Sequence, residues 1–430
     1  MKTLNIGLVG FGTVGAGVVK ILRAHADQME ANTGLRLRLG AVCDLDLTSD
    51  RGVDVPDDLL TDDVESVLAD PEIDVLCELV GGTTFARDLI LRAFDAGKHV
   101  VTANKALLAE HGRELFAKAE QTGRSISFEG SVCGGIPLLR AVREGHPGGE
   151  ITRLTGIVNG TCNYILTEMA ERGADYESAL AAAQDAGYAE ADPTLDVNGV
   201  DSAHKLAILA RLAFCREIDF GGIHVEGISG IQPMDIEFGA EMGYVVKLLA
   251  IAKLAEGELE LRVHPTFLLG DHPLAAVSGV FNAVWIRGEA TGDTMHYGKG
   301  AGQMPTAAAV VSDLVDVGLG RAAINAASCR ALSSRLEPAR IRKISEIETQ
   351  YYMRFTVLDQ PGVLAAISGI LGKHRISIDS AHQAERSPEG YVFVVMIAHR
   401  AREHGLAEAL AEIDRLDVVK APTQLIRIER

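Results

Sequence analysis

The residues best suited to chemistry lie close together in the middle of the chain. The segment Gly187–Asp196 (GYAEADPTLD) puts three carboxylates into a loop broken by proline. Asp201 and Lys205 follow at the start of an expected helix. They are four residues apart, so both project from one face with the acid N-terminal to the base. A partly buried lysine can take a hydroxyl proton as a hydride leaves the same carbon, while the carboxylate orients it. Another carboxylate, such as Glu190, can bind a substrate ammonium.

The same pair also fits an ordinary surface ion pair on the first turn of a helix, which contributes little to stability. Ile208, Leu209 and Leu212 continue its face as an apolar stripe, which favours an inward orientation at the edge of a cleft. The sequence leaves both interpretations open. His204, the neighbour of the lysine, is expected to be a packed or solvent-edge histidine.

A glycine-rich loop near the N-terminus predicts dinucleotide binding. The sequence GFGTVG follows an expected strand, Leu4–Val9, and opens an expected helix, Thr13–Ala26. Glycines there permit a tight turn and let the backbone approach a pyrophosphate at the helix N-terminus. A simple glycine-rich turn is the alternative. The loop residues expected to hold the cofactor are Gly10, Gly12, Thr13, Val14 and Gly15.

The choice between NAD and NADP stays open. Asp44 ends the second expected strand, where an acid can bind the ribose hydroxyls of NAD; an ordinary strand-end residue is the alternative. It lies farther from Gly15 than the ~20 residues usual for this arrangement, so the connection Ala31–Arg38 must carry extra residues. Arg51 offers an alternative partner, for the 2′-phosphate of NADP.

Composition excludes several classes of partner. The net charge of −18 argues against nucleic acid or an anionic membrane as the main partner. The six cysteines form no CxxC pair, which indicates reduced thiols and neither a disulfide framework nor a zinc site. The chain shows no cleavable signal pattern and no apolar run of membrane-spanning length. A cytoplasmic protein is expected.

The expected fold is α/β with three parts. Residues 1–135 alternate strands and helices, which predicts a Rossmann-type doubly wound parallel sheet, completed by 305–345. Residues 136–304 form a mixed α+β catalytic and dimerisation domain. A polar linker around 333–349 leads to residues 350–430, with the order strand, helix, strand, strand, helix, strand. Those elements are expected at Tyr351–Leu358, Val363–Lys373, Ile376–Ser380, Tyr391–Ala398, Arg402–Asp414 and Gln424–Glu429.

Five ordered stretches resemble the homoserine dehydrogenase family over nearly the whole chain. They are VTANKAL at 101–107, EGSVCGGIP at 129–137, NGTCNY at 159–164, the block 187–205, and GAG at 300–302 with Pro305 and Thr306. The resemblance implies reversible NAD(P)-dependent oxidation of L-homoserine to L-aspartate 4-semialdehyde, in threonine, methionine and isoleucine biosynthesis. By position it implies Lys205 as the proton donor and acceptor, with Asp201 and Glu190 on the substrate. It also implies Lys105 beside nicotinamide and substrate, and Gly187 and Gly302 along the cofactor.

The same resemblance suggests a monovalent cation, sodium. The carbonyls of Val132, Gly134 and Ile136 would hold it, with Glu129 alongside, and hard oxygen ligands suit such an ion. The residues alone indicate only a turn there. Two positions depart from the family: Lys299 stands where proline is frequent, and Asn198 where an acid is frequent.

The last ~80 residues resemble an ACT domain. The turn DQPGVL, which starts at Asp359, precedes a helix whose N-terminal N–H groups can hold an amino-acid carboxylate, and the aspartate can accept from the ammonium. Asp359 and Gly362 are therefore expected to bind an effector, L-threonine, that lowers activity. Alternatively, Asp359 only caps the helix and the domain is a platform for a homodimer or homotetramer.

Two rival functions are weaker. A semialdehyde dehydrogenase would acylate Cys133, but no sequence-adjacent histidine is present to make the thiolate. A dinucleotide-sensing regulator would not need the acid-and-lysine block, and the chain has no basic DNA-reading segment.

Overall fold

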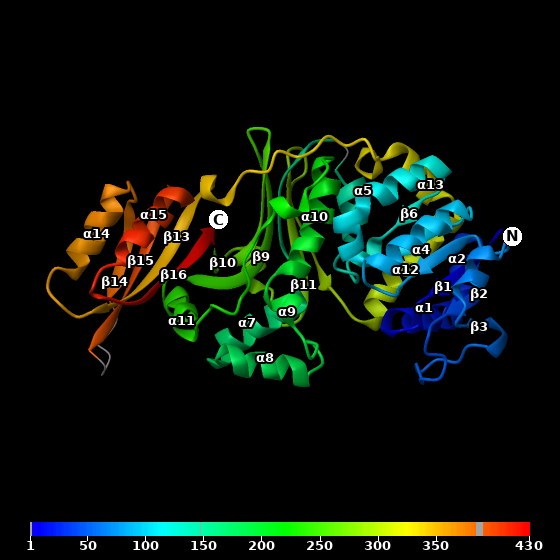
Figure 1. Ribbon diagram of the computed structural model, residues 1–430, viewed down its shortest axis with the longest axis horizontal. Helices are drawn as coiled ribbons and strands as arrows, with labels where there is room; N and C mark the ends of the chain where they lie inside the picture. Colours follow the sequence, from blue (N-terminus) through cyan, green and yellow to red (C-terminus); the bar gives the residue numbers. More distant parts are fainter. Residues whose placement is uncertain (1, 147, 384–389) are drawn as a thin grey trace. The chain divides into compact units, whose positions relative to one another are not determined.

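The computed structural model describes residues 2–146, 148–383 and 390–430. The chain divides into two compact units, each made of three separate segments of the sequence. The first unit comprises Met1–Gly160, Asp201–Gly221 and Val280–Ala339. The second unit comprises Thr161–Val200, Gly222–Gly279 and Arg340–Arg430. Figure 1 labels their helices and strands.

A six-stranded parallel sheet organises the first unit, in the order β3-β2-β1-β4-β5-β6. Most residues of its central strands, β1 and β4, are buried because helices cover both faces. This order confirms the expected doubly wound sheet. The strands are β1 (Lys2–Val9), β2 (Leu35–Cys43), β3 (Leu60–Thr61), β4 (Val75–Glu78), β5 (His99–Thr102) and β6 (Ile126–Ser127). The helices are α1 (Thr13–Ala24), α2 (Ala26–Thr33), α3 (Val64–Ala69), α4 (Thr84–Asp95), α5 (Lys105–Thr122), α6 (Leu138–Glu144), α12 (Gln303–Gly318) and α13 (Arg321–Ser328).

Helix α12 returns from late in the chain to pack against α1, as Figure 1 shows. The approach is close: a Cβ at Gly17 would lie 2.8 Å from the carbonyl oxygen of Gln303 and 2.9 Å from the Cβ of Ala307. Leu314 and Val317 of α12 belong to the same hydrophobic core as the strands of the sheet. Helix α12 therefore shares one hydrophobic core with the N-terminal sheet.

An antiparallel set of strands also belongs to the first unit. β11 (Phe281–Gly288) pairs with β7 (Ile151–Ile157) on one side and with β12 (Gly292–Lys299) on the other. On one face of this set, the guanidinium groups of Arg153 and Arg287 both lie over the ring of Trp285. The centres of those groups lie 5.3 and 4.7 Å from the ring centroid.

The second unit is built on one sheet whose strands run in the order β9-β10-β16-β13-β15-β14. β9 (Tyr244–Ala255) and β10 (Glu258–Leu269) form a long antiparallel hairpin, and β8 (His224–Val225) pairs with β10. The other strands are β13 (Glu348–Leu358), β14 (Ile378–Gln383), β15 (Tyr391–Arg402) and β16 (Val419–Glu429). The helices are α7 (Gly160–Arg172), α8 (Tyr176–Asp185), α9 (Thr194–Val197), α11 (Pro233–Glu241), α14 (Val363–Lys373) and α15 (Glu403–Ile413).

The C-terminal strands and helices confirm the expected βαββαβ order. In Figure 1, α14 and α15 cover one face of strands β13 to β16. Tyr351, Phe355, Ile367, Leu406 and Ile413 are among the fully buried residues of the core between them. This small sheet does not stand alone, because β16 pairs in parallel with β10.

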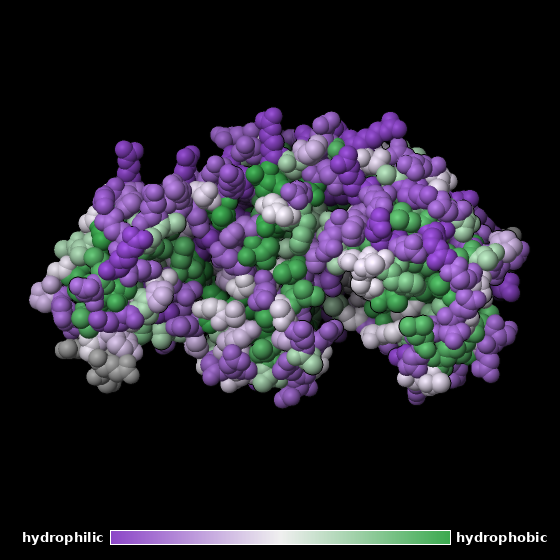
Figure 2. All heavy atoms as spheres, in the orientation of Figure 1, coloured by the Kyte–Doolittle hydropathy of each residue, from purple (hydrophilic) through white to green (hydrophobic). Residues whose placement is uncertain are grey.

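Several elements differ from the sequence expectation. The extra residues between the first helix and the second strand form a helix, α2, instead of a plain connection. The segment expected to be a polar linker is held by backbone hydrogen bonds. The N–H of Leu259 donates to the carbonyl of Arg340, and the N–H of Arg342 donates to the carbonyl of Leu259. No helix in the described part of the chain is long and apolar enough to cross a membrane. Hydrophilic residues cover much of the face seen in Figure 2.

Candidate active site

The pair identified from its spacing lies on α10 (Val200–Phe214). The Nζ of Lys205 lies 2.7 Å from Oδ2 of Asp201, across one turn of the helix. Both residues are buried, with 8% and 5% of their surface exposed. The interpretation as an exposed surface ion pair is therefore wrong.

Asp201 is the centre of a larger cluster. Its Oδ1 accepts from Nζ of Lys105 at 2.9 Å, and its Oδ2 accepts from Nδ2 of Asn159 at 2.9 Å. Burial acts to raise the pKa of Asp201, but the ammonium groups of Lys205 and Lys105 outweigh it and hold that pKa well below its usual range. The carboxylate is therefore ionised throughout the physiological pH range.

The backbone positions both lysines. Lys205 donates to the carbonyl oxygen of Val158 at 2.7 Å, directly after β7 ends. Lys105 is the first residue of α5, whose start is fixed because the Asn104 side chain accepts from the N–H of Leu107. The two lysines differ in access, since 42% of the Lys105 side chain is exposed. His204 is packed, as expected, with its ring stacked 4.7 Å from that of Phe220.

The glycine loop has the geometry that a pyrophosphate site requires. Gly10 has φ +99°, and a Cβ there would lie 2.6 Å from the carbonyl group of Leu79. A Cβ at Gly15 would lie 2.1 Å from the carbonyl oxygen of Gly10. Gly12 is the N-cap of α1 and has open space beside it, with no side chain bonded to the first turn begun by Thr13 and Val14. The N–H groups of that turn are thus left to an anion.

Asp44 supports the glycine loop. Its Oδ2 accepts from the N–H of Phe11 at 2.6 Å, and its Oδ1 accepts from the N–H of Asp46 at 2.9 Å. Arg51 lies on the loop that follows and pairs with Asp46 at 3.0 Å. An acid and a guanidinium are therefore both present on the loop after β2, and the geometry alone does not choose between them.

The other residues assigned to the cofactor and substrate lie apart in sequence. Gly302 has φ +121° and is the N-cap of α12, in the first unit. Gly187, with φ +72°, follows α8 in the second unit, and Glu190 is exposed three residues later. The amide of Gln184 donates to the carbonyl oxygen of Glu190 at 3.1 Å, which anchors that part of the loop.

In the turn expected to hold a cation, the carboxylate of Glu129 already accepts hydrogen bonds from backbone N–H groups. Glu129 accepts from the N–H groups of Leu139 and Arg140 at 2.9 and 3.0 Å, so its carboxylate caps the start of α6. Burial raises the pKa of Glu129. The carbonyl of Ile136 accepts from the N–H of Leu138 at 2.7 Å and keeps a second lone pair. Among the described residues, no three His, Cys, Asp or Glu side chains are arranged to hold a metal.

Cys133 does not have the environment of a nucleophile. It is 1% exposed, and burial raises the pKa of its thiol. Its Sγ accepts from Nδ2 of Asn282 at 3.3 Å. A protonated, buried thiol opposes the rival acylation chemistry.

Two groups of supporting residues were not assigned roles from the sequence. Asn159 and the carbonyl of Val158 hold the lysine–aspartate pair, although Asn159 stands in the NGTCNY stretch, which was the available signal. Glu78, fully buried at the end of β4, accepts from the N–H groups of Val80 and Gly81 and from the Thr102 hydroxyl. It fixes the loop beyond the carboxyl end of the sheet, where ligands of such sheets bind.

Comparisons with known proteins place this chain in a family. The family model described as homoserine dehydrogenase matches residues 137–315, and the one described as its NAD binding domain matches residues 10–129. A homoserine dehydrogenase of Pseudomonas aeruginosa is 41% identical over the full length of both chains. This chain belongs to the homoserine dehydrogenase family. It is accordingly an NAD(P)-dependent oxidoreductase of amino-acid biosynthesis.

Other homoserine dehydrogenases are also similar to this chain. The Bacillus subtilis protein is 41% identical over all of this chain and 99% of its own length. The crystal structure of a homoserine dehydrogenase from Thiobacillus denitrificans has 41% identity and a TM-score of 0.93, covering 100% of this chain and 99% of that one. A hyperthermophilic archaeal homoserine dehydrogenase in complex with NADPH has 26% identity and a TM-score of 0.62, covering 74% of this chain and 98% of that one. Residues 351–417 match the ACT domain model.

Proposed function

We propose that the protein interconverts L-homoserine and L-aspartate 4-semialdehyde, in the route to threonine, methionine and isoleucine, by direct hydride transfer. The observation that supports this most is the buried cluster of Lys205, Asp201 and Lys105, in the same unit as the glycine loop. It supplies a proton-transfer group that is fixed by a permanent negative charge. The nicotinamide, when bound, accepts the hydride from the carbinol carbon.

Lys205 moves the proton. In its neutral form its Nζ takes the proton of the substrate hydroxyl as the C–H bond breaks, and in the reverse direction its ammonium returns a proton to the aldehyde oxygen. Asp201 holds Nζ in place at 2.7 Å and stabilises the ammonium that forms. Lys105, half in solvent, shares that carboxylate and lowers the affinity of the cluster for a further proton.

The substrate is proposed to be bound by groups of opposite charge. Asp201 and Lys105 would hold the reacting end, and the exposed carboxylate of Glu190 would bind the ammonium. A direct test uses homoserine deuterated at the carbinol carbon. The deuterium is expected in the reduced cofactor, and its recovery in solvent would rule out this mechanism.

NADP or NAD is proposed as the cofactor, held by Gly10, Gly12, Thr13, Val14, Gly15, Lys105, Gly187 and Gly302. Asp44 would accept from the ribose hydroxyls of NAD, and Arg51 would turn from Asp46 to the 2′-phosphate of NADP. Arg51→Ala should then raise the KM for NADP and leave that for NAD unchanged. Equal changes in both KM values would contradict this assignment.

A monovalent cation, sodium, is proposed at the carbonyls of Val132, Gly134 and Ile136. Cys133, with φ +50°, curls the backbone between them. Because the carboxylate of Glu129 caps α6, it would contribute charge to the ion without bonding it directly. Activity in sodium chloride should exceed activity in choline chloride at equal ionic strength, and equal rates would argue against the ion.

The ACT domain is proposed to bind L-threonine and lower activity. A cavity of about 180 Å³ is lined by residues 357–364 with Gln383, Val392 and Val394. Gly362 has φ +94° and is the N-cap of α14, so Asp359 does not cap that helix as its N-cap residue. No side chain caps the first turn of α14, and apart from the N–H of Val363, which donates to the carbonyl of Gln360, its N–H groups are proposed to hold a carboxylate.

The effector test should use the full chain, because removal of the ACT domain would also remove β16 from its pairing with β10. Titration with L-threonine should lower the rate, and Asp359→Ala should abolish that effect while keeping the uninhibited rate. An absence of binding heat in the wild type would leave the domain with a structural role.

A homodimer or homotetramer in the cytoplasm is the proposed working form. Within the described residues, one edge of the small sheet is taken by β10, which leaves β14 as the edge for pairing with a second copy. Light scattering should show at least twice the monomer mass, and a monomer at working concentration would overturn the proposal.

A further inference from the structure

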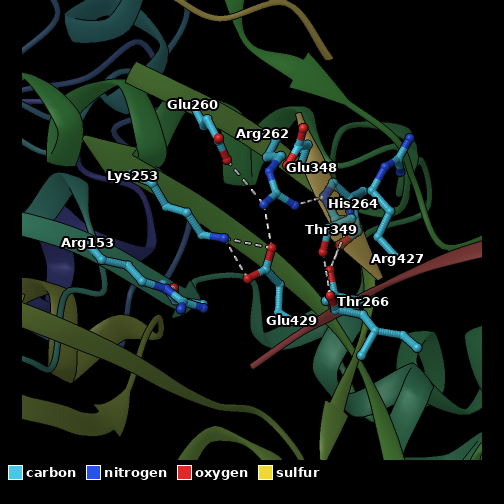
Figure 3. A network of polar contacts seen from close by, with 12 residues as sticks. Arg153, Lys253, Glu260, Arg262, His264, Thr266, Glu348, Thr349, Arg427 and Glu429 are labelled. Carbon is cyan, nitrogen blue, oxygen red and sulfur yellow. Dashed lines mark hydrogen bonds and ion pairs between the residues drawn. The ribbon is translucent and has the colours of Figure 1, made fainter. Parts of the chain in front are cut away.

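Buried and half-buried charges join the C-terminal strand β16 to the strands of the β8–β10 region. We call this group the seam: it consists of Lys253, Arg262, Arg427, Glu226, Glu403 and Glu429. Figure 3 shows its centre, where Lys253 and Arg262 converge on Glu429 and Arg262 also reaches His264. Since Arg427 and Glu429 are two residues apart on one strand, they lie on the same face of it.

The half of the seam around Glu429 ties strands of one sheet together. Lys253 donates to both oxygens of Glu429 at 2.9 and 2.7 Å, and the guanidinium of Arg262 bonds the same carboxylate. These contacts connect β16 with β9 and β10, which already pair through their backbones. This half therefore needs no role beyond stability.

The half of the seam around Arg427 connects α15 with the segment that follows β8. Arg427 is 4% exposed and holds two carboxylates at once. Its Nε donates to Glu403, the first residue of α15, at 3.0 Å. Its Nη1 and Nη2 donate to the two oxygens of Glu226 at 2.8 and 2.9 Å. A single guanidinium thus bridges a helix of the ACT domain and the residue that follows β8.

The segment after Glu226 presses on the turn that precedes α10. A Cβ at Gly227 would lie 2.3 Å from the carbonyl oxygen of Val197, and the N–H of Ile228 donates to that oxygen at 2.9 Å. A Cβ at Gly199 would lie 3.1 Å from the carbonyl oxygen of Glu226. The two backbones are therefore in direct contact, and a shift of one moves the other.

We infer that Arg427 is a positioning residue for the amino-acid substrate. By clamping Glu226, it fixes the turn Val197–Gly199, and with it the loop that carries Glu190 and the start of α10. The inference rests on the proposed function, since it uses the roles proposed there for Glu190 and Asp201. It adds that the ACT domain supports the substrate site through one side chain even without an effector.

The geometry of the guanidinium makes the proposed role of Arg427 specific to arginine. Its planar fork fixes the orientation of each carboxylate, which a single ammonium cannot do for two partners on different sides. Glu403 touches Arg427 and Tyr351, whereas Glu226 touches Arg427 and His224. A change at Glu403 can therefore reach the turn at Val197 by way of Arg427.

Steady-state kinetics of Glu226→Gln, Glu403→Gln and the double variant, in the full chain, test the inference. Each single variant is expected to raise the KM for homoserine roughly fivefold or more, the usual scale for a lost charge-assisted hydrogen bond. The KM for the cofactor should not change. The double variant should be no worse than the poorer single variant, because both remove one bridge.

The matched control is Asp235→Asn. Asp235 accepts from Arg354 at 2.6 and 3.1 Å and is fully buried, so it forms a bidentate pair of the same kind between α11 and the ACT sheet. It should lower Tm while leaving the KM for homoserine unchanged. Unchanged KM values in the two glutamine variants, with only Tm lowered, would overturn the inference.

A second measurement covers variants that fold poorly. In Arg427→Lys, hydrogen exchange at the Ile228 amide should become faster than in the wild type, and unchanged protection there would also overturn the inference. A wild type that does not oxidise homoserine would instead overturn the proposed function, so the two failures are distinguishable.

Discussion

Among the described residues, lysine and carboxylate side chains meet in the cluster of Lys105, Lys205 and Asp201 and in the seam. In the cluster, two ammonium groups face one carboxylate. In the seam, Lys253, Arg262 and Arg427 face Glu226, Glu403 and Glu429, and Arg262 also pairs with Glu260 at 3.5 Å. The seam therefore has no excess of cations, while the cluster has one. Each group has one half-exposed member, since 42% of the Lys105 side chain and 41% of the Glu226 side chain are exposed.

Charge balance, more than burial, separates these two regions. A network whose cations are all matched by carboxylates satisfies its own members and holds elements together. A cluster with an excess cation retains capacity to bind an electron-rich group and to exchange a proton. Changes at Lys205, Lys105, His264 and Cys133 test this distinction.

Lys205→Ala should lower kcat by on the order of 10²–10⁴, the usual range for loss of a general acid–base. The matched control is Lys253→Ala, which removes a lysine that is likewise paired with a buried carboxylate, Glu429, at 2.7 Å. It should lower Tm and leave kcat within a small factor of the wild type. Equal losses of kcat in the two variants would show that both regions act only through stability.

Lys105→Met should lower kcat/KM for homoserine by roughly 10–100-fold, because an ammonium that holds Asp201 and faces solvent is lost. The control is Lys118→Met on the same helix, where the lysine pairs with Asp95 at 2.5 Å. Steady-state kinetics at saturating cofactor would measure both. A loss confined to the KM of the cofactor would place Lys105 outside the substrate site.

Mild acid should lower the free energy of unfolding through His264, which contacts Arg262 of the seam. Asp201 of the cluster should make no such contribution in mild acid. Burial, together with Arg427 and Arg262, lowers the pKa of His264 well below its usual value, so the folded state keeps the ring neutral. The unfolded chain takes up that proton below a pKa of ~6.5, so each further pH unit lowers the free energy of unfolding by about 1.4 kcal/mol. The loss continues down to the folded pKa.

Urea unfolding at pH 7.5, 6.5 and 5.5 would reveal that slope, and His264→Gln should reduce it. Asp201 has its pKa lowered instead, so its stabilising effect is present above the unfolded carboxyl pKa and is lost only as pH falls through a much more acidic range. A wild-type slope that His264→Gln leaves intact would assign it to other groups.

Cys133→Ser should change kcat by less than about threefold, since a hydroxyl can also accept from Asn282 and the buried thiol takes no part in hydride transfer. A thioester mechanism would instead lose nearly all activity in this variant. The comparison of one assay before and after the exchange decides between the two chemistries.

Local patterns were the predictable part of this chain. The helix Val363–Lys373 and the strand His99–Thr102 have the expected ends, because their apolar spacing and flanking residues are local signals. The Asp201–Lys205 pair follows from helical geometry alone. The roles of these residues stay predictions.

Contacts between distant segments were not predictable in the same way. β9 has the sequence YVVKLLAIAKLA, in which Leu, Ala and Lys favour a helix, and only its pairing with β10 makes it a strand. The bonds from Lys105 and Asn159 to Asp201 join separate elements, so no spacing in the sequence indicates them. The seam likewise depends on the parallel pairing of β16 with β10.

The close packing of α1 against α12 has a consequence during synthesis, because the ribosome makes α12 long after α1. Lys20 of α1 donates to Gln303 of α12, a residue 283 positions later in the chain. At a ribosomal rate of roughly 5–20 residues per second, the second partner is made about a quarter of a minute to a minute after the first. During that interval the apolar face of α1 that α12 will cover has no permanent neighbour. The nascent N-terminal half is therefore a client for chaperones, and slower translation of the middle segment would lengthen its exposure.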